Sequence, residues 1–425
     1  MDLTKSSAED LKALHVEAAA RFDGLRGRNL SLDITRGKPS ADQLSLSDDL
    51  LTIVKPGDTN DENGTDLRNY GGLVGIPEAR RLFAEYLGTT PERIIIGGNS
   101  SLAMMWDVIS NAMTYGVPGG EGPWRDQNPK IICPVPGYDR HFAICERLGI
   151  EMPTVPMTPE GPDLDAIRAL VKDDPSVKGI WCVPKYSNPS GEVYSDATVK
   201  ALAEMETAAP DFRLLWDNAY AVHYVGDAPA EIADIMAACE AAGNPDRAIV
   251  FGSTSKITHA GAGVAMLASS PANIDDHIEK ITFAMIGPDK INQLRQVKFF
   301  KDMDGILDHM AKHAEIIRPK FEAVINALES DLGGKGLATW TNPKGGYFLS
   351  VDVVDGCATE IVKRCADAGV KITPAGATFP YGKDPNDRNI RIAPTLPSVE
   401  EVASAMKVFT AAVEVVCVEK LLSET

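Results

Sequence analysis

Apolar and polar residues repeat along this chain with two different periods, and the period changes with position. Residues 8–25 have the spacing of an amphipathic helix, and the next stretch, to about Leu46, is rich in Gly, Pro and Asp without a clear period. Further on, short β-branched runs alternate with helical patterns, which favours an α/β fold with a mainly parallel, doubly wound sheet. The expected strands are Arg93–Ile96, Lys130–Cys133, Lys178–Val183, Arg213–Trp216 and Ala248–Gly252.

After about residue 300 the pattern changes and predicts a smaller α+β domain. The expected elements are a long helix near 307–328, a strand-like run at 345–351, another helix, a short strand at 389–392 and a closing helix from Ser398. We expect a large domain over 47–300, a small domain over 301–425, and an N-terminal helix and wrapping segment over 1–46 that belongs to the small domain.

The charge balance restricts the classes of partner. With 44% hydrophobic and 24% charged residues, the 425-residue chain has the composition of an ordinary globular protein. Its 42 basic and 60 acidic residues give a net charge of −18, which opposes broad contact with nucleic acids or anionic membranes. Neither partner is therefore expected, and an anionic substrate would need a local group of Arg or Lys side chains.

The seven cysteines are scattered, and several lie in apolar runs such as 180–183. Because no CxxC pair or zinc-ligand spacing is present, we expect reduced core cysteines and no metal site. The first residues are polar, and no window approaches the roughly 18 apolar residues of a membrane span. A soluble, cytoplasmic protein is the expectation.

Polar side chains follow three successive predicted strands at the points where these strands end. In open α/β sheets, ligands bind outside the carboxyl ends of the strands. We therefore expect these side chains to meet at one rim of the sheet. The residues are Asn188 after the first strand, Asp217 and Tyr220 after the second, and Ser253 and Lys256 after the third.

This set of side chains matches the needs of pyridoxal phosphate. That cofactor requires a Lys amine for a Schiff base and an acidic partner that keeps its pyridine nitrogen protonated. Lys256 and Asp217 have the right chemistry for these two tasks. Asn188 and Tyr220 are potential donors to the phenolic oxygen of the cofactor.

Two further motifs suit the other parts of the same cofactor. Its phosphate requires backbone amides at a helix start, which the turn Gly98-Asn99-Ser100-Ser101 can supply between a strand and an apolar helix pattern. Tyr138 could cover the ring with its aromatic face. Together these motifs predict an enzyme that uses pyridoxal phosphate to transfer amino groups.

The ordered set resembles one enzyme family, the fold type I, class I aminotransferases, and most closely the divergent aspartate aminotransferase subgroup Ic. The resemblance covers nearly the whole chain and implies the pyridoxal-phosphate-dependent transferase fold, with a large and a small domain. Any single motif would be weak, but their order is specific. The matching segments also include Thr35-Arg36-Gly37-Lys38-Pro39, Asn69-Tyr70-Gly71-Gly72 and Asn389-Ile390-Arg391-Ile392-Ala393-Pro394.

The resemblance implies a role for each matching residue at the reacting end of the cofactor. Lys256 would form the Schiff base, and Asp217 would pair with the pyridine nitrogen. Asn188 and Tyr220 would bond the phenolic oxygen. Arg391 would clamp the α-carboxylate of the substrate in a bidentate geometry that Lys could not reproduce.

The resemblance also implies contacts around the rest of the cofactor. Tyr138 would stack on the ring, and Ser253 would hold the phosphate together with the turn at 98–101. Tyr70 would reach in from a second subunit. A homodimer with shared active sites is therefore expected.

Two departures from the family pattern concern the phosphate and the link after one strand. The family usually has an Arg about eight residues after the Schiff-base Lys, whereas residues 257–264 here contain none. Another cation must then balance the phosphate. The segment 184–188 has one residue more than is common, and Lys185 is a candidate for that cation.

The expected reaction has two halves. An incoming amino acid displaces Lys256, whose freed amine moves the Cα proton, and a 2-oxo acid leaves; a second 2-oxo acid, expected to be 2-oxoglutarate, reverses these steps with ping-pong kinetics. L-Aspartate is the expected donor, which gives oxaloacetate and L-glutamate. The distal carboxylate then needs a cation, with Arg36 preferred because its segment, with Gly37, lies beside the substrate in the family. The other candidates are Lys38, Lys290 and Arg295.

Other interpretations stay open. The chain could be an aminotransferase of 2-aminoadipate, aromatic or alanine specificity, or a non-catalytic pyridoxal-phosphate-binding regulator domain, although no DNA-binding module is evident. Residues 253–256 also satisfy the S-x-x-K motif of penicillin-binding acyl enzymes, but the motif order is wrong.

Each motif also has a structural interpretation. Asn188-Pro189 is common in turns, and Asp217 and Ser253 could be helix caps. His309 and His313 share a helix face but lack a third metal ligand, so they are expected to be solvated or packing residues. The order of the motifs at successive strand ends favours the enzyme.

Overall fold

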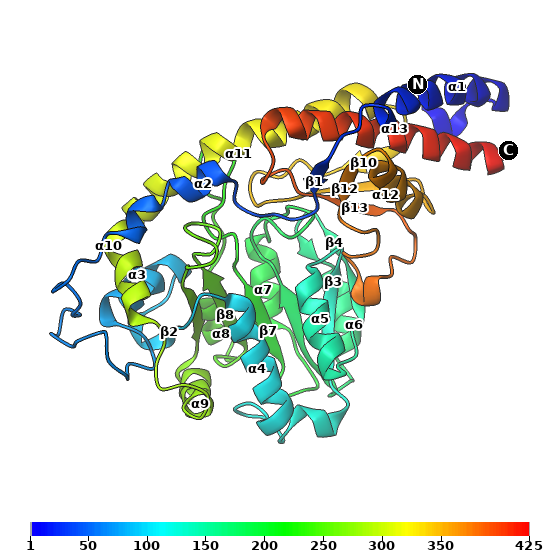
Figure 1. Ribbon diagram of the computed structural model, residues 1–425. Helices are drawn as coiled ribbons and strands as arrows, with labels where there is room; N and C mark the ends of the chain where they lie inside the picture. Colours follow the sequence, from blue (N-terminus) through cyan, green and yellow to red (C-terminus); the bar gives the residue numbers. More distant parts are fainter. Residues whose placement is uncertain (1, 425) are drawn as a thin grey trace.

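An eight-stranded sheet forms the centre of the molecule in the computed structural model, which describes residues 2–424 (Figure 1). Its strands, in spatial order, are β2 (Ile94–Ile96), β9 (Ala265–Ser269), β8 (Ala248–Ser253), β7 (Arg213–Asp217), β6 (Val177–Cys182), β3 (Lys130–Val135), β4 (Thr154–Thr158) and β5 (Gly161–Pro162). Pairing is parallel from β8 through β7, β6 and β3 to β4, and antiparallel at β2–β9, β9–β8 and β4–β5. The predicted mainly parallel sheet is confirmed.

The central parallel strands β6, β7 and β8 are buried on both faces, and this explains their sequences. Every residue of β6, β7 and β8 is buried, as expected for strands with helices on both sides. All five strands predicted from the sequence are present, with bounds shifted by no more than about two residues. Strand β9 was not predicted because its sequence, Ala-Met-Leu-Ala-Ser, has no β-branched residue, so its pairing with β8 and β2 determines its conformation.

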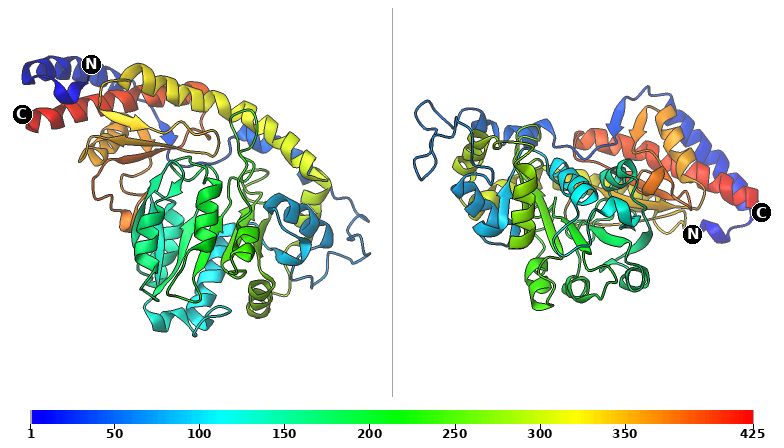
Figure 2. Two further views of the ribbon diagram at one scale, coloured as in Figure 1. Left: turned by 180° about the vertical axis from the view of Figure 1, so that it is seen from behind. Right: turned by 90° about the horizontal axis from the view of Figure 1, so that it is seen from below.

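Helices cover the two faces of the sheet with separate apolar clusters. One face packs against α4 (Ser101–Tyr115), α5 (Asp139–Leu148) and α9 (Pro271–Ile281). The other face packs against α3 (Pro77–Leu87), α6 (Leu164–Val171), α7 (Asp196–Glu204), α8 (Ile235–Ala241) and α10 (Lys290–Phe300). Figure 2 shows this two-sided cover from behind.

The C-terminal part forms a smaller α+β unit around a third apolar cluster. Its antiparallel sheet contains β10 (Ala338–Trp340), β11 (Leu349–Val353) and β13 (Asn389–Ile392). The helices of this part are α11 (Met303–Leu332), α12 (Ala358–Asp367) and α13 (Val399–Glu424). The helices predicted at 8–25, near 307–328 and from Ser398 are all present, and α12 is the further helix expected between the strand-like run and the short strand.

The N-terminal segment is built into this C-terminal part. Helix α1 (Ala8–Arg26) lies beside α13 in both views, and β1 (Leu32–Ile34) pairs in parallel with β12 (Val370–Ile372) (Figures 1 and 2). A short helix α2 (Ala41–Ser45) follows. This pairing supports the expectation that the first residues belong to the small domain, whose boundaries stay a prediction. Single 3-10 turns occur at Leu3–Lys5, Asp48–Leu51, Pro91–Arg93, Trp124–Gln127 and Pro380–Gly382.

The cysteines behave as the sequence predicts. All seven are buried and none forms a disulfide, so they are reduced core residues. Among the helices of residues 2–424, none has the length and apolar character needed to cross a membrane.

A buried ion pair ties β6 to the chain just before β7. The Nζ of Lys178 donates to Oδ1 of Asp211 at 2.8 Å, and the two side chains are only 3% and 0% exposed. The other carboxylate oxygen accepts the indole N–H of Trp124 at 2.8 Å. Burying a carboxylate without such partners costs free energy of folding, so loss of Lys178 would leave an uncompensated buried charge on Asp211.

We predict that Lys178→Met lowers the free energy of unfolding by about 3–5 kcal/mol, because it leaves the Asp211 carboxylate buried without a cation. Denaturant unfolding followed by circular dichroism measures the loss. The matched control is Lys200→Met, since the ion pair of Lys200 with Glu204 is 71% and 56% exposed and should contribute less than about 1 kcal/mol. Equal stability of the two variants would contradict the prediction.

Candidate active site

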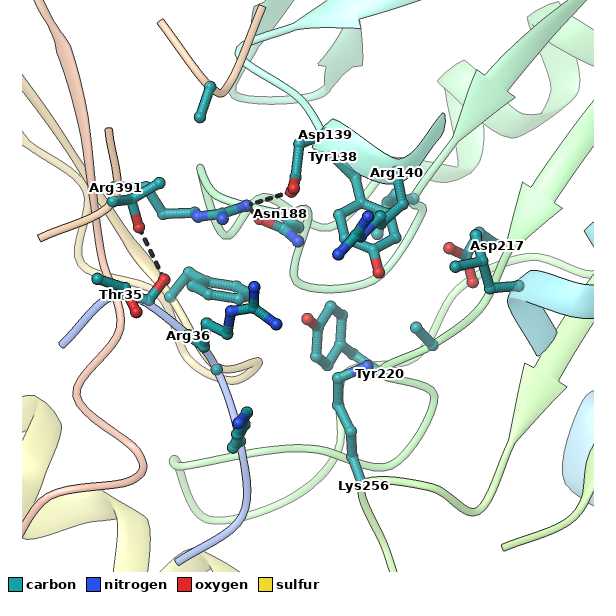
Figure 3. Close-up of a pocket in the computed structure, with 18 of the residues that line it drawn as sticks. Thr35, Arg36, Tyr138, Asp139, Arg140, Asn188, Asp217, Tyr220, Lys256 and Arg391 are labelled. Atoms are coloured by element: carbon teal, nitrogen blue, oxygen red, sulfur yellow. Dashed lines mark hydrogen bonds and ion pairs between the residues drawn. The ribbon is translucent and has the colours of Figure 1, made fainter. Parts of the chain in front are cut away.

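A cavity of about 430 Å³ lies at the rim where β6, β7 and β8 end (Figure 3). The sheet contributes one wall, and the segment after β1 together with the C-terminal part contributes the other. The cavity is therefore formed between the large sheet and the smaller α+β unit. Of the residues predicted from the sequence, Arg36, Gly37, Ser101, Tyr138, Asn188, Asp217, Tyr220, Lys256 and Arg391 line it.

Lys256 follows β8 and extends its side chain into the cavity towards Tyr220 (Figure 3). Its Nζ lies 5.0 Å from the centroid of the Tyr220 ring. Burial lowers the pKa of Lys256, and the nearby carboxylate of Asp217 partly opposes that effect. Lys256 therefore releases its proton more readily than an exposed lysine, and a neutral amine is the form that can act as a nucleophile or a base.

Asp217 is the last residue of β7 and is held by a histidine. Its Oδ2 lies 2.9 Å from Nε2 of His141 on α5. The imidazole stacks on Trp181 of β6, with ring centroids 4.2 Å apart and planes 5° from parallel. Oδ1 of Asp217 is buried and has no hydrogen-bond partner among the described residues. The carboxylate is thus fixed on one side and available to a ligand on the other.

Two phenols stand over the cavity. Burial raises the pKa of Tyr220 well above its ordinary value, and the charges of Tyr138 and Asp217 raise it further. Burial also raises the pKa of Tyr138, which makes an edge contact with His141. Both hydroxyls therefore stay protonated near neutral pH and can donate hydrogen bonds.

Arg391 enters the cavity from the C-terminal part. It lies on β13 opposite Ser350 of β11, and this pairing fixes where the side chain starts. One terminal nitrogen donates to Oδ1 of Asp139 at 3.0 Å and to Oδ1 of Asn188 at 3.3 Å, and the guanidinium lies 4.8 Å from the centroid of the Phe348 ring. Its Nε is buried without a partner, so part of the guanidinium remains free for an anion.

The segment Thr35–Lys38 crosses the mouth of the cavity and is fastened to the C-terminal part. The hydroxyl of Thr373 donates to the carbonyl of Thr35, and the hydroxyl of Thr395 donates to the carbonyl of Lys38, both at 2.9 Å. A Cβ at Gly37 would lie 2.5 Å from Cζ of Phe348, so a larger residue would push the segment away. Arg36 and Lys38 both line the cavity.

The residues predicted to bind the phosphate do not all line one cavity. Ser101 lines the main cavity, whereas Gly98 and Asn99 line a neighbouring one. The Ser100 hydroxyl caps α4 by accepting the N–H of Ala103 at 3.2 Å. Ser253 ends β8, is buried, and lines neither cavity. The structure therefore brings the backbone of this turn close to the site but not all of the side chains.

Three cations proposed from the sequence are not in the main cavity. Lys290 donates to the carbonyls of Asn69 and Gly71, and Arg295 lines the neighbouring cavity, so neither is placed to bind the distal carboxylate of a substrate. Lys185 donates to the carbonyl of Ala221 at 3.0 Å and lines a separate cavity. Its assignment to the phosphate is wrong because the link after β6 turns its side chain away.

Tyr70 is 83% exposed and does not line the cavity of its own chain. The loop that carries it is held by Lys290 through the carbonyls on either side. An exposed tyrosine on a loop held by hydrogen bonds is consistent with a side chain that contacts another subunit. This role of Tyr70 stays a prediction.

The sequence interpretation missed His141, Asp139 and Arg140, which all follow Tyr138 at the start of α5. Asp139 and Arg140 line the cavity, and His141 holds Asp217. The signal was present, because these residues come soon after β3, another parallel strand that ends at the same rim.

A chain of buried polar groups supports Lys256 from behind. The Tyr347 hydroxyl donates to the carbonyl of Lys256 and accepts from Nε2 of Gln43, both at 3.0 Å. The same amide nitrogen lies 3.0 Å from Nδ1 of His313, and Nε2 of His313 lies 3.1 Å from Nε2 of His309. Burial lowers the pKa of His313 to about 3. The two histidines are therefore neutral packing residues, as one of the two sequence interpretations expected.

In protein freed of any cofactor, the lowered pKa of Lys256 predicts that its amine is labelled at a lower pH than that of an exposed lysine. Fluorodinitrobenzene does not titrate and reacts only with neutral amines, so the reaction at Lys256 should reach half its maximal rate below the ordinary lysine pKa of 10.5. Asp217→Asn should lower that midpoint further, because the carboxylate favours the charged amine. Mass spectrometry of labelled peptides follows Lys256 and, as an internal reference, the exposed Lys200 in the same sample. A midpoint for Lys256 at or above that of Lys200 would contradict the prediction.

Comparison with known proteins places these features in context. The model of one protein family, described as aspartate amino-transferase, matches residues 5–425. An aspartate aminotransferase of Corynebacterium glutamicum is 47% identical over 96% of this chain and 94% of its own length. A 2-aminoadipate transaminase of Thermus thermophilus is 24% identical over 78% of each chain.

Solved structures agree on the fold. The crystal structure of an aspartate transaminase from Corynebacterium glutamicum has a TM-score of 0.97, 46% identity, and covers 99% of both chains. The α-aminoadipate aminotransferase LysN of Thermus thermophilus, complexed with N-(5'-phosphopyridoxyl)-L-leucine, has a TM-score of 0.74 at 22% identity, covers 96% of this chain and 98% of its own, and supports the fold alone.

Proposed function

The chain belongs to the aspartate amino-transferase family, and we propose that it exchanges amino groups between L-aspartate and 2-oxoglutarate, giving oxaloacetate and L-glutamate. Membership makes it a class I aminotransferase of the pyridoxal-phosphate-dependent kind, with the fold of that class. The observation that carries the aspartate proposal is the group of cations in one cavity. Arg36, Lys38, Arg140 and Arg391 line it in a chain whose net charge is −18.

The residues present fit pyridoxal phosphate. Lys256 supplies an amine with a lowered pKa. The unpartnered Oδ1 of Asp217 can accept a hydrogen bond from the protonated ring nitrogen of the cofactor. Asn188 and Tyr220 line the same cavity and can donate to the phenolic oxygen, and Tyr138 can cover the ring. When bound, the cofactor supplies an electron sink for the bond that breaks at Cα. His141 keeps the Asp217 carboxylate in place for that task.

Arg391 would bind the α-carboxylate of the amino acid. Asn188 and Asp139 already orient its guanidinium from one side, and the Nε side is free. A guanidinium held in this way gives a carboxylate two parallel hydrogen bonds and so fixes the direction of the Cα–H bond. The amine of Lys256, once free, then takes the proton from the Cα of the amino acid and delivers it to the adjoining carbon of the cofactor.

The distal carboxylate of aspartate would be bound by Arg36 and Arg140. In Figure 3 the side chain of Arg36 points into the cavity from the segment after β1, and that of Arg140 enters from the start of α5. Neither arginine forms an ion pair within residues 2–424. Two such guanidinium groups can balance the second negative charge of a dicarboxylic amino acid.

We also propose that the protein is a cytoplasmic homodimer with shared active sites, to which Tyr70 contributes. Several large apolar side chains near its loop are exposed, including Phe283 at 91% and Ile286 at 62%. The loop itself is packed against Gly287, where a Cβ would lie 2.3 Å from the carbonyl oxygen of Gly71. An exposed apolar group of this kind on a water-soluble chain marks an interaction surface.

The first test is an absorbance spectrum of the purified protein with pyridoxal phosphate. We expect a cofactor band near the visible edge, which L-aspartate removes and 2-oxoglutarate restores, whereas Lys256→Ala shows no such change. Absence of any band even with added cofactor would refute the enzyme assignment. A band that ignores L-aspartate but responds to 2-aminoadipate, an aromatic amino acid or alanine would instead favour one of the other specificities.

A second test separates the two carboxylate sites. We expect Arg36→Gln and Arg140→Gln each to raise KM for L-aspartate about tenfold or more, because each removes a charge-assisted hydrogen bond of roughly 1.5–3 kcal/mol. The KM for L-alanine, which has no distal carboxylate, should change little. Arg147→Gln, an exposed arginine on the same helix, is the control. Equal effects on both substrates would argue against a distal-carboxylate site.

A further inference from the structure

A second cavity, of about 280 Å³, adjoins the turn that leads into α4. We propose that Arg295, which lines this cavity, supplies the positive charge for the phosphate of the cofactor. The inference rests on the proposed function, since it concerns the cofactor of that reaction. It answers the question raised by the sequence, where no arginine follows Lys256 within eight residues.

The walls of this cavity are held together by main-chain and side-chain hydrogen bonds. Gly97 N–H donates to the carbonyl of Ala265 at 2.8 Å, and Ala265 N–H donates to the carbonyl of Gly98 at 2.7 Å. Nδ2 of Asn99 donates to the carbonyl of Gly261 at 3.0 Å, and the hydroxyl of Ser255 donates to the carbonyl of Asn99 at 2.9 Å. The turn before α4 is therefore tied to the residues on both sides of Lys256.

The position of α10 directs Arg295 to the same cavity. Nδ2 of Asn292 donates to the carbonyls of Ala262 and Gly263 at 3.0 and 2.9 Å, which fixes the first turns of the helix against the loop. Arg295 is three residues further on, so it shares the face of Asn292. Helical side chains lean towards the N-terminus, and this brings Arg295 over the cavity that Asn292 also lines.

The charges around the cavity leave Arg295 available. It is the one cation among the described residues that line it, and no ion pair of Arg295 occurs within residues 2–424. The carboxylate of Asp289, which also lines the cavity, accepts the N–H of Asn292 at 2.9 Å and so serves as the cap of α10. An anion bound there would meet one free guanidinium.

The eighth residue after Lys256 is Val264, and it lines the same cavity. An apolar side chain at this position leaves room that a longer one would fill. The turn 97–99, which leads into α4, lines this cavity as well. The Ser100 side chain accepts only the N–H of Ala103, so the cap leaves other backbone N–H groups at the start of α4 free. A phosphate at that helix start would have amides on one side and Arg295 on the other.

Other cations are committed elsewhere. Lys185 and Lys290 donate to backbone carbonyls away from this cavity, and Arg391 pairs with Asp139. Arg36 and Arg140 line the main cavity and not this one. Arg295 is thus the cation whose position and free charge fit the phosphate.

The experiment compares two ligands that differ only in the phosphate. The full chain is freed of cofactor and titrated with pyridoxal phosphate and with pyridoxal, and binding is followed by absorbance. We expect Arg295→Gln to weaken pyridoxal phosphate binding about tenfold or more and to leave pyridoxal binding unchanged. Arg295→Lys should recover part of the loss. Lys298→Gln is the control, because Lys298 lies on the same helix but pairs with Asp58.

Two results would overturn the assignment of Arg295. One is an Arg295→Gln variant that binds pyridoxal phosphate as tightly as the wild type does. The other is an equal loss for pyridoxal phosphate and pyridoxal, since that indicates a disturbed fold and no specific contact with the phosphate. If the wild type still reacts with L-aspartate in either case, the proposed function stands; if the wild type binds no pyridoxal phosphate at all, both proposals fail.

Discussion

The parallel pairing of β6, β7 and β8 is the constraint on which the site depends. Cys182 lies opposite Trp216, and Asp217 lies opposite Phe251, so the three strands end at nearly the same level. Their continuations then leave the sheet side by side, and this brings an amide, a carboxylate and an amine to one rim. A shift of one residue in either pairing would turn the side chains that follow to the other face of the sheet.

The second half of the site comes from the smaller α+β unit, and its packing completes the cavity. Arg391 is placed by the register of β13 on β11, and the segment before α2 is held by threonine hydroxyls of the same unit. The Gln43 and Tyr347 hydrogen bonds then join this segment to the backbone of Lys256. The groups proposed to bind the substrate and the cofactor are therefore parts of one connected structure, although they lie far apart in the sequence.

The sequence was sufficient for those parts of the structure that depend on local pattern. Buried β-branched runs gave the parallel strands, and polar residues directly after them gave Asn188, Asp217 and Lys256. The pattern failed where partners far along the chain decide the outcome. Strand β9 forms through pairing on both edges, His141 matters through its contact with Asp217, and Lys185 points away because its link turns towards Ala221. None of these contacts leaves a periodic signal in the sequence.

The proposed roles of the cations are consistent with the acidic character of the chain. With a net charge of −18, long-range attraction does not favour a dicarboxylate, so recognition depends on short-range contacts inside the cavity. Arginine suits this task because it keeps its charge when partly buried and offers paired donors. Three of these cations start from positions fixed by secondary structure: Arg391 from β13, Arg140 from α5 and Arg295 from α10. Because these three origins lie on separate elements, each of these guanidinium groups is held in its position by its own element before a ligand binds.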